Sequence, residues 1–329
     1  MKVLFIGGTG NISVSVSRLA VARGFDLYLL NRGRQGVTIE GATTITADIT
    51  QPDQVQAALG DHHFDAVVNW IAFVEPDIER DLALFGGRCK QYIFISTASA
   101  YQKPLTYPLI TESTPLANPY WQYSRDKIRC EDRLMRAYRE DGFPITIVRP
   151  SHTYDTRIPV AVGNWASYLI PQRMLEGKPV IVHGDGTSLW TLTHAEDFAR
   201  GFVGLLGHPQ AIGHAFHITS DFVLTWNQVY KQIGDALGVT PVLVHIPSEF
   251  IATVDPATGA GLLGDKMWSS MFDNSKIKRF VPDYVARIPF HLGIRRTIAW
   301  FQADASRMHV TPDDDAQLER ILTAYHAAH

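Results

Sequence analysis

The sequence predicts an α/β protein: a Rossmann-type, doubly wound parallel sheet followed by a smaller C-terminal α+β domain. Short apolar runs alternate with amphipathic helical patterns throughout the first half of the chain. Two of these runs, VLFI and YIFI, are apolar at every position, as expected for strands that are buried on both faces. A glycine cluster also follows the first run and precedes a helical pattern, which is typical of the first βα corner of such a sheet.

The individual elements follow in the same order along the chain. We expect strands at residues 3–6, 27–30, 43–47, 66–69, 92–96 and 145–148, and helices at residues 11–23, 51–59 and 120–140. In the second half, Thr225 is expected to cap a helix that runs to Leu237. Thr311, followed by Pro312 and three aspartates, predicts a C-terminal helix because a capping hydroxyl, a proline and acids favour a helix start.

Size and composition set the expected domain organisation. The chain has 329 residues, of which 46% are hydrophobic and 19% are charged, and this suits one large α/β unit or two interleaved domains. We expect residues 1–160 to form a dinucleotide-binding Rossmann domain, with residues 188–222 returning to it. Residues 161–329 are expected to form mainly a substrate-binding domain.

The charge balance and the absence of special segments argue against several classes of function. The net charge is −3 and no block of lysine or arginine is present, which argues against a nucleic-acid partner. No apolar run is long enough to span a bilayer, so we expect no membrane association and a cytoplasmic location. Cys89 and Cys130 form no metal or redox motif, and no metal site is predicted.

The glycine cluster predicts a binding site for a dinucleotide. Glycines let the backbone approach a pyrophosphate closely, and the N-terminus of the following helix offers free N–H groups. The residues expected to contact the cofactor here are Gly7, Gly10, Asn11 and Ile12. Ser13 stands where a third glycine is usual, and we expect its side chain to displace the helix slightly.

The adenosine end of the site leaves the choice between NAD and NADP open. The second strand ends at Asn31, and no acid is present there to bind the ribose hydroxyls. In one interpretation, Arg32 and Arg34 attract the 2′-phosphate of NADP. In the other, both arginines lie in solvent and Asn31 binds the ribose of NAD. Asp48 and Ile49, after the third strand, are expected to meet the adenine ring.

A tyrosine and a lysine on the long helix predict acid–base chemistry. Tyr123 and Lys127 are four residues apart, so their side chains share one helix face. A neighbouring ammonium group and an oxidised nicotinamide both stabilise a phenolate, which would let Tyr123 exchange a proton with a substrate oxygen during hydride transfer. The hydroxyl-rich segment 96–99, at the carboxyl end of the fifth strand, would add a hydroxyl group beside them.

At these residues the sequence resembles the extended short-chain dehydrogenase/reductases, the NAD-dependent epimerase/dehydratase family, over nearly its whole length. GGTGNIS resembles the family's GGTGFIG, ISTASAY its ISS…VYG segment, YSRDK its YxxxK motif, RPSHTYD its RPxxVYG segment and GDGTSLWTLTHAEDFA its GDGxxxRDFIHVDD segment. The resemblance implies that Thr97 is the catalytic hydroxyl residue and that Pro150 lines the nicotinamide. It also implies a small-molecule sugar substrate, commonly a nucleotide sugar, and often a homodimer formed through a helix pair. Parts of the sequence also resemble a subgroup that includes chloroplast stem-loop RNA-binding proteins.

The sequence departs from the family pattern on the substrate side. Ala98 and Ser99 stand where 4,6-dehydratases carry Asp and Glu, so elimination of water is not expected. Trp190 stands where many nucleotide-sugar enzymes carry an arginine on the diphosphate, and an indole can stack on a sugar but cannot pair with phosphate. Trp190 and His152 are the candidate substrate residues, with a buried structural histidine as the alternative for His152.

Three further residues are expected to have structural roles only. Trp165 is expected to be a packing residue. The neighbouring Asp265 and Lys266 are expected to form local polar structure without a chemical role.

These observations leave three functions open. The leading hypothesis is an NAD(P)-dependent epimerase that oxidises a sugar carbinol, lets the keto intermediate turn over and returns hydride to the opposite face. A net dehydrogenase or reductase of a sugar or another polyol is the first alternative. An RNA-binding or regulatory protein on the same fold is the second, against which the Tyr123–Lys127 pair and the acidic charge argue.

Overall fold

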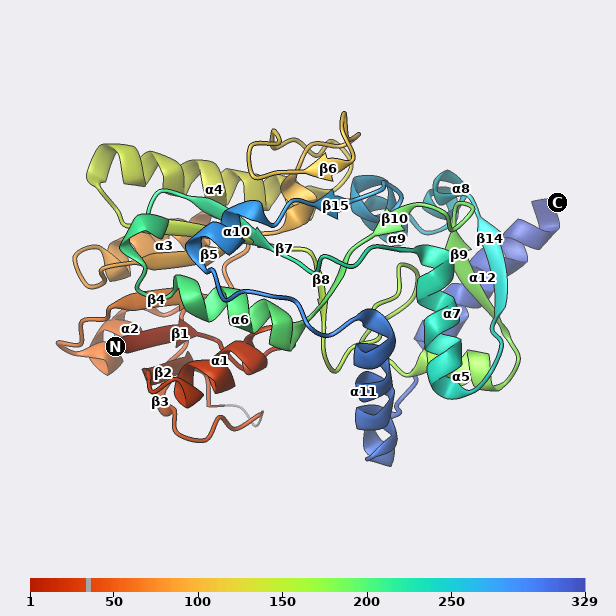
Figure 1. Ribbon diagram of the computed structural model, residues 1–329, viewed down its shortest axis with the longest axis horizontal. Helices are drawn as coiled ribbons and strands as arrows, with labels where there is room; N and C mark the ends of the chain where they lie inside the picture. Colours follow the sequence, from red (N-terminus) through yellow and green to blue (C-terminus); the bar gives the residue numbers. More distant parts are fainter. Residues whose placement is uncertain (34–36, 329) are drawn as a thin grey trace.

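A seven-stranded sheet forms the centre of the computed structural model, which describes residues 1–33 and 37–328 (Figure 1). The strand order is β12-β7-β5-β4-β1-β2-β3, and every neighbouring pair is parallel. The strands are β1 (Lys2–Ile6), β2 (Asp26–Asn31), β3 (Thr43–Thr46), β4 (Ala66–Asn69), β5 (Tyr92–Ile95), β7 (Ile145–Pro150) and β12 (Ala215–Ile218). The direction of winding reverses between β1 and β4, and such a switch point opens a crevice at the carboxyl ends of the strands. The predicted Rossmann-type sheet is therefore confirmed.

Helices cover both faces of this sheet. On one face, α1 (Ser13–Ala22) packs against α6 (Ala195–Leu205); the other face carries α2 (Pro52–Leu59), α3 (Glu75–Phe85) and α4 (Gln122–Asp141) (Figure 1). Side chains of a strand alternate between its two faces. Accordingly Val3 and Phe5 lie in the core with α1 and α6, whereas Leu4 and Ile6 lie in the core with the other three helices.

The second half of the chain forms an α+β unit beside the carboxyl edge of the sheet (Figure 1). Its helices are α5 (Leu169–Leu175), α7 (Trp226–Leu237), α8 (Ser248–Val254), α9 (Pro256–Gly261), α11 (Phe290–Gln302) and α12 (Pro312–Ala328), and its parallel strand pair is β9 (Pro179–His183) and β14 (Val242–Ile246). As predicted, Thr225 caps α7, since its Oγ1 accepts from the Gln228 N–H at 3.2 Å. Thr311 likewise accepts from the Asp314 N–H at 3.2 Å at the start of α12.

Short elements connect the two halves. They are β6 (Leu109–Ile110), β8 (His152–Tyr154), β10 (Leu189–Trp190), β11 (Leu192–His194), β13 (Leu224–Thr225), β15 (Met271–Phe272), α10 (Ser275–Phe280), the 3₁₀ turns η1 (Ala98–Ala100), η2 (Pro209–Ala211) and η4 (Ala305–Arg307), and the π-helical turn η3 (Leu262–Lys266). Between them, residues 195–218 supply α6 and the edge strand β12 of the large sheet. The division into domains at residue 160 stays a prediction. None of the described helices is both long and apolar enough to cross a bilayer.

Candidate active site

A cavity of about 820 Å³ lies at the carboxyl edge of the sheet. Its walls come from the glycine turn after β1, the loop after β4, the ends of β5 and β7, the start of α4, the loop at residues 160–165 and the end of η3. This size is typical of a ligand-binding cleft, and the position is the switch point of the sheet. The cavity is therefore the candidate active site.

The structure brings most of the predicted site residues to this cavity. The residues from the prediction that line it are Gly7, Gly10, Asn11, Ile12, Thr97, Tyr123, Lys127, Pro150 and His152. They come from four separate segments of the chain, and parallel strand ends place them at one edge.

Tyr123 and Lys127 lie on the first turns of α4, facing Thr97 at the end of β5. The Lys127 Nζ atom lies 5.9 Å from the centroid of the Tyr123 ring, and Thr97 and Tyr123 both line the cavity. Burial raises the pKa of Tyr123 to about 12; the Thr97 hydrogen bond lowers it and the charge of Asp265 raises it further. The phenol is therefore protonated near neutral pH until a cofactor or substrate changes its surroundings.

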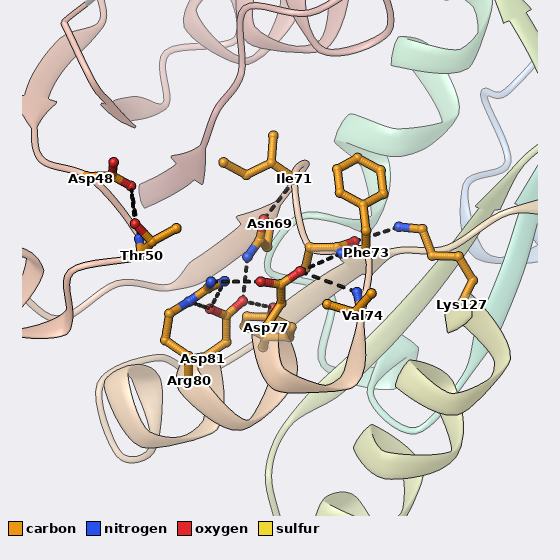
Figure 2. A network of polar contacts seen from close by, with 12 residues as sticks. Asp48, Thr50, Asn69, Ile71, Phe73, Val74, Asp77, Arg80, Asp81 and Lys127 are labelled. Carbon is orange, nitrogen blue, oxygen red and sulfur yellow. Dashed lines mark hydrogen bonds and ion pairs between the residues drawn. The ribbon is translucent and has the colours of Figure 1, made fainter. Parts of the chain in front are cut away.

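Lys127 is buried, and its position is set by two backbone carbonyls. Its Nζ donates to the Ala72 oxygen at 2.6 Å, in the loop that Lys127 faces in Figure 2, and to the Ile95 oxygen at 2.8 Å. Burial lowers the pKa of Lys127 to about 8, opposed by the negative charges of Glu131 and Asp77. The ammonium group is thus held between the loop after β4 and the end of β5.

The loop after β4 is fixed by side chains that bind its backbone (Figure 2). The Asn69 Oδ1 atom accepts from the Ile71 N–H at 2.8 Å. The Asp77 carboxylate accepts from the N–H groups of Phe73 at 2.8 Å and Val74 at 3.3 Å. As a result the carbonyl that accepts from Lys127 lies in a loop with little freedom.

A buried carboxylate anchors this arrangement from below. Asp81 is fully buried, accepts from the Tyr92 hydroxyl at 2.5 Å and from the Asn69 amide, and pairs with Arg80 at 2.9 Å (Figure 2). Burial raises the pKa of Asp81, whereas the charge of Arg80 lowers it. Because all its partners are in place, this buried polar network stabilises one loop conformation.

The glycine turn has the geometry that a dinucleotide needs. Gly7 and Gly8 have φ values of +90° and +94°, which side chains rarely adopt, and a Cβ on Gly8 would lie 2.8 Å from Leu29 Cδ2. A Cβ on Gly10 would meet only Ser13 Oγ at 3.6 Å, so the space in front of Gly10 is open. Ser13 Oγ accepts from the Gly10 N–H at 2.9 Å, and the expected displacement of the helix stays a prediction.

Unpaired polar atoms in the cavity wall also fit a bound cofactor. Asn11 Oδ1 and Trp70 Nε1 are buried without a hydrogen-bond partner among the described residues, and both residues line the cavity. Buried polar atoms normally have a partner. The polar groups of a dinucleotide would supply one here.

The residues predicted for the adenosine end lie outside the cavity lining. Asn31 ends β2, and its Oδ1 accepts from the Gly33 N–H at 2.9 Å, while Arg32 is exposed. Asp48 follows β3 and accepts from Thr50 at 2.8 Å and 3.0 Å (Figure 2), and Ile49 is buried. Arg34 falls outside the described residues. The roles of these residues toward adenosine stay predictions.

The two candidate substrate residues have different positions. His152 lines the cavity, and its ring lies 5.3 Å from that of Trp165. Burial and the charge of Lys266 keep the pKa of His152 well below its usual value, so the imidazole is neutral, and its Nδ1 has no partner among the described residues. Trp190 is only 2% exposed, packs against Trp226 in the core and does not line the cavity. The structure therefore does not bring Trp190 to the substrate, because its indole fills the core behind His152.

Trp165, Asp265 and Lys266 are among the cavity residues that were not predicted from the sequence. Trp165 is 42% exposed and lines the cavity, which corrects its interpretation as a packing residue. Asp265 and Lys266 also line the cavity, at the end of η3. The turn signals around Trp165 could have indicated an exposed loop, whereas no sequence pattern links η3 to a site that lies more than 100 residues earlier in the chain.

Comparison with known proteins gives the family. Residues 3–219 match the model of the NAD dependent epimerase/dehydratase family. The chain is 26% identical over 295 residues to 2'-dehydrokanamycin reductase of Streptomyces kanamyceticus, covering 87% of this chain and 81% of that protein. It is 26% identical to the chloroplast stem-loop binding protein of 41 kDa b of Arabidopsis thaliana, covering 76% and 67% of the two chains.

Solved structures share the fold. The UDP-glucose 4-epimerase of Bifidobacterium longum, in complex with NAD⁺ and UDP, superposes with a TM-score of 0.75 at 16% identity, over 93% of this chain and 100% of that chain. The family match covers more than half of the sequence and agrees with the Rossmann-type sheet. The chain belongs to the NAD-dependent epimerase/dehydratase family, the extended short-chain dehydrogenase/reductases that use NAD or NADP.

Proposed function

We propose that this protein transfers hydride between a nicotinamide dinucleotide and a carbinol or keto carbon of a sugar, with Tyr123 as the acid–base residue. The observation that carries the proposal is that Thr97, Tyr123, Lys127 and the glycine turn all line one cavity. The nicotinamide, when bound, would supply or accept the hydride.

Three side chains of the cavity would have separate roles in proton transfer and substrate orientation. In reduction, Tyr123 would donate its proton to the substrate oxygen, and Thr97 would orient that oxygen through a hydrogen bond. Lys127 would stabilise the resulting phenolate, since its ammonium group lies beside the Tyr123 ring. In oxidation the same groups act in the reverse order.

The substrate side favours net oxidation or reduction of a sugar without a nucleotide. No arginine is among the described residues that line the cavity, and Trp190, which stands at the family's arginine position, is buried in the core. An epimerase must hold its keto intermediate while the intermediate turns, and a cavity without a diphosphate anchor has less with which to retain it. The similarity to a 2'-dehydrokanamycin reductase points in the same direction.

Epimerisation is the second candidate, and dehydration is not proposed. The family includes epimerases, and the acid–base pair of this chain would serve both half-reactions of an epimerase. Dehydration needs an acid and a base directly after the proposed catalytic threonine, but Ala98 and Ser99 stand at these two positions. The Ser99 hydroxyl is hydrogen-bonded to the Thr97 hydroxyl at 3.0 Å and to the Ser124 hydroxyl at 2.7 Å.

Replacement of Tyr123 by phenylalanine tests the proposal. We expect hydride transfer to fall by about 10²- to 10⁴-fold, the usual contribution of a positioned acid or base, while dinucleotide binding stays largely intact. Activity would be followed as nicotinamide absorbance with a panel of sugars and sugar ketones, with Tyr107→Phe, an exposed tyrosine, as the control. Full turnover by Tyr123→Phe would defeat the assignment.

The state of the cofactor separates the two enzyme candidates. Protein that releases abundant NAD on denaturation and changes no net absorbance supports an epimerase, whereas empty protein that consumes NADPH or NADH with a ketone supports a reductase. Salt-sensitive RNA binding by Tyr123→Phe, without any hydride transfer by the wild type, would favour an RNA-binding role, as the name of the Arabidopsis relative suggests.

A further inference from the structure

The π-helical turn η3 brings two charged residues from the C-terminal half into the cavity. Asp265 and Lys266 are its last two residues, and their side chains are 15% and 18% exposed. π-helical turns are rare and are frequently found at functional sites. This turn therefore needs an explanation beyond local polar structure.

Side chains from three other segments fix the backbone of the turn. The Gly264 oxygen accepts from Asn118 Nδ2 at 2.6 Å. The Lys266 oxygen accepts from His183 Nε2 at 3.0 Å and from Trp226 Nε1 at 3.1 Å. Asn118, His183 and Trp226 are all at least 96% buried. The turn consequently presents its two charged side chains from a rigid base.

The turn also packs closely against the start of α4. A Cβ on Gly264 would lie 2.7 Å from the Trp121 Cβ, so only glycine fits at this contact. The Lys266 Nζ atom lies 5.3 Å from the centroid of the Trp121 ring. Because Tyr123 is two residues from Trp121, the turn places Asp265 and Lys266 beside the acid–base pair, on the substrate side of the cavity.

The two side chains are paired only loosely. The Lys266 Nζ atom lies 3.5 Å from Asp265 Oδ2, whereas charge-assisted hydrogen bonds are usually about 2.7–2.9 Å long. Neither side chain has a hydrogen bond to another group among residues 1–33 and 37–328. The Asp265 carboxylate can accept a hydrogen bond from a ligand, and the Lys266 ammonium group can donate one to it. A ligand that carries both a donor and an acceptor would therefore fit both side chains.

The lining of the same cavity also offers an aromatic face and a neutral imidazole. Trp165 is 42% exposed in the cavity wall, and the His152 ring lies between it and the core. An exposed indole suits the C–H face of a sugar ring, and a neutral imidazole suits one hydroxyl group. No arginine is among the described lining residues, and the Asp265 carboxylate beside the Lys266 ammonium group disfavours a phosphate there.

We propose that Asp265 and Lys266 bind two neighbouring hydroxyl groups of an uncharged sugar. Asp265 accepts a hydrogen bond from one hydroxyl group, Lys266 donates one to the other, and Trp165 covers the face of the sugar ring. This inference rests on the proposed function, since it assigns the substrate class of the same cavity. It predicts that the non-reacting part of the substrate is a sugar diol without a nucleotide.

Ligand-observed saturation-transfer NMR tests this assignment without hydride transfer. Tyr123→Phe protein, saturated with NAD⁺ or NADP⁺, would be mixed with methyl α-glucoside, methyl α-galactoside or methyl α-mannoside, and separately with glucosamine, glucose 6-phosphate and UDP-glucose. We expect at least one uncharged glycoside to bind, and Asp265→Asn and Lys266→Met each to weaken that binding by about tenfold. Asp283→Asn and Lys231→Met, at exposed positions, are matched controls that should bind as before.

Several outcomes would overturn the inference. These are binding of none of the glycosides, preference for UDP-glucose, glucose 6-phosphate or glucosamine, or unchanged binding by both variants. Thermal unfolding of each variant shows whether a loss of binding comes from a loss of folding. Glycoside binding that depends on Asp265 and Lys266, together with no hydride transfer by the wild type, would count against the proposed function alone.

Discussion

At the residue scale, burial moves the pKa values of Tyr123 and Lys127, the proposed acid–base pair, in opposite directions. Burial raises the pKa of Tyr123 to about 12 and lowers that of Lys127 to about 8, because a buried group loses the hydration of its charged form. The two values therefore lie far apart, whereas the pKa values of the free side chains are both close to about 10. The Tyr123 phenol consequently stays protonated near neutral pH, and the charge of Lys127 becomes sensitive to pH near 8.

The pH dependence of reduction should report the charge of Lys127. Its pKa in the folded chain is lowered to about 8, so the ammonium charge is present below this pH and is lost as the pH rises through it. We expect kcat/KM for reduction of a keto sugar to be level below pH 8 and to fall above it. The profile would be measured between about pH 6 and pH 10, within the range where lysine charge can change.

Substitution of the lysine identifies the group that titrates. Lys127→Met should be less active at every pH and should lose the decline above pH 8, whereas Lys231→Met, at an exposed position, should keep the wild-type profile. An unchanged decline in Lys127→Met would show that another group is responsible.

At the scale of elements, the glycine turn contains one glycine that folding requires and another that only ligand binding would require. Gly8 is required by the backbone, since its φ is +94° and a Cβ would lie 2.8 Å from Leu29. Gly10 is free of both constraints, because its Cβ would meet only Ser13 Oγ at 3.6 Å. Two glycines of one motif are therefore required for different physical reasons: Gly8 by the fold and Gly10 by the proposed bound cofactor.

Alanine at these two positions should produce different losses. Gly8→Ala should destabilise the fold by about 1–3 kcal/mol through strain and overpacking. Gly10→Ala should leave the unfolding temperature nearly unchanged but weaken dinucleotide binding, since the new methyl group would occupy the open space beside the cofactor. Thermal unfolding and the fluorescence of bound NADH or NADPH would measure both. Unchanged dinucleotide binding by Gly10→Ala would contradict the placement of the cofactor.

A single buried asparagine links three elements of the cavity. Asn118 Nδ2 donates to the oxygens of Ser99 and Gly264, and its Oδ1 accepts from the N–H groups of Tyr120 and Trp121, both at 3.1 Å. The segment after β5, the start of α4 and the turn η3 therefore share one anchor. Their relative position should depend on this side chain.

Removal of this anchor should affect both stability and catalysis. We expect Asn118→Ala to lower the free energy of unfolding by about 2–4 kcal/mol, because it leaves buried backbone groups without partners, and to lower kcat as η3 and α4 loosen. Asn164→Ala, at an exposed position, should cost less than about 1 kcal/mol. Urea unfolding and initial rates would show the effects; wild-type stability in Asn118→Ala would refute the linking role.

At the scale of the whole molecule, the cavity is assembled from both halves of the chain. Its cofactor side consists of the sheet and its loops, while Trp165, Asp265 and Lys266 come from the second half. A ligand that fills the cavity contacts both halves. Binding should therefore stabilise the chain as a unit.

A dinucleotide should raise the stability of the chain by an amount set by its affinity. At a concentration 100 times its Kd, we expect about 2.7 kcal/mol of added stability, seen as a higher unfolding temperature. Comparison of NAD⁺ with NADP⁺ identifies the cofactor, and Arg32→Ala should remove any preference for NADP⁺. A shift with neither dinucleotide would contradict the proposed function.

Local sequence patterns determined a large part of this molecule. The runs VLFI and YIFI, the glycine turn and the Tyr123–Lys127 spacing predicted the sheet, its first corner and the acid–base pair, since each depends on residues close together in the chain. The order of the βα units then placed these residues at one sheet edge, because parallel strands share a direction. The convergence of the glycine turn, Tyr123 and Lys127 on one cavity was predictable for this reason.

The substrate side was decided by the tertiary structure alone. Trp190 has the position of a binding residue in the motif, yet packing against Trp226 puts its indole in the core. Asp265 and Lys266 look like ordinary loop charges, yet Asn118, His183 and Trp226 hold their turn against the cavity. Contacts between residues far apart in the chain depend on how all side chains pack together, and no local pattern records them.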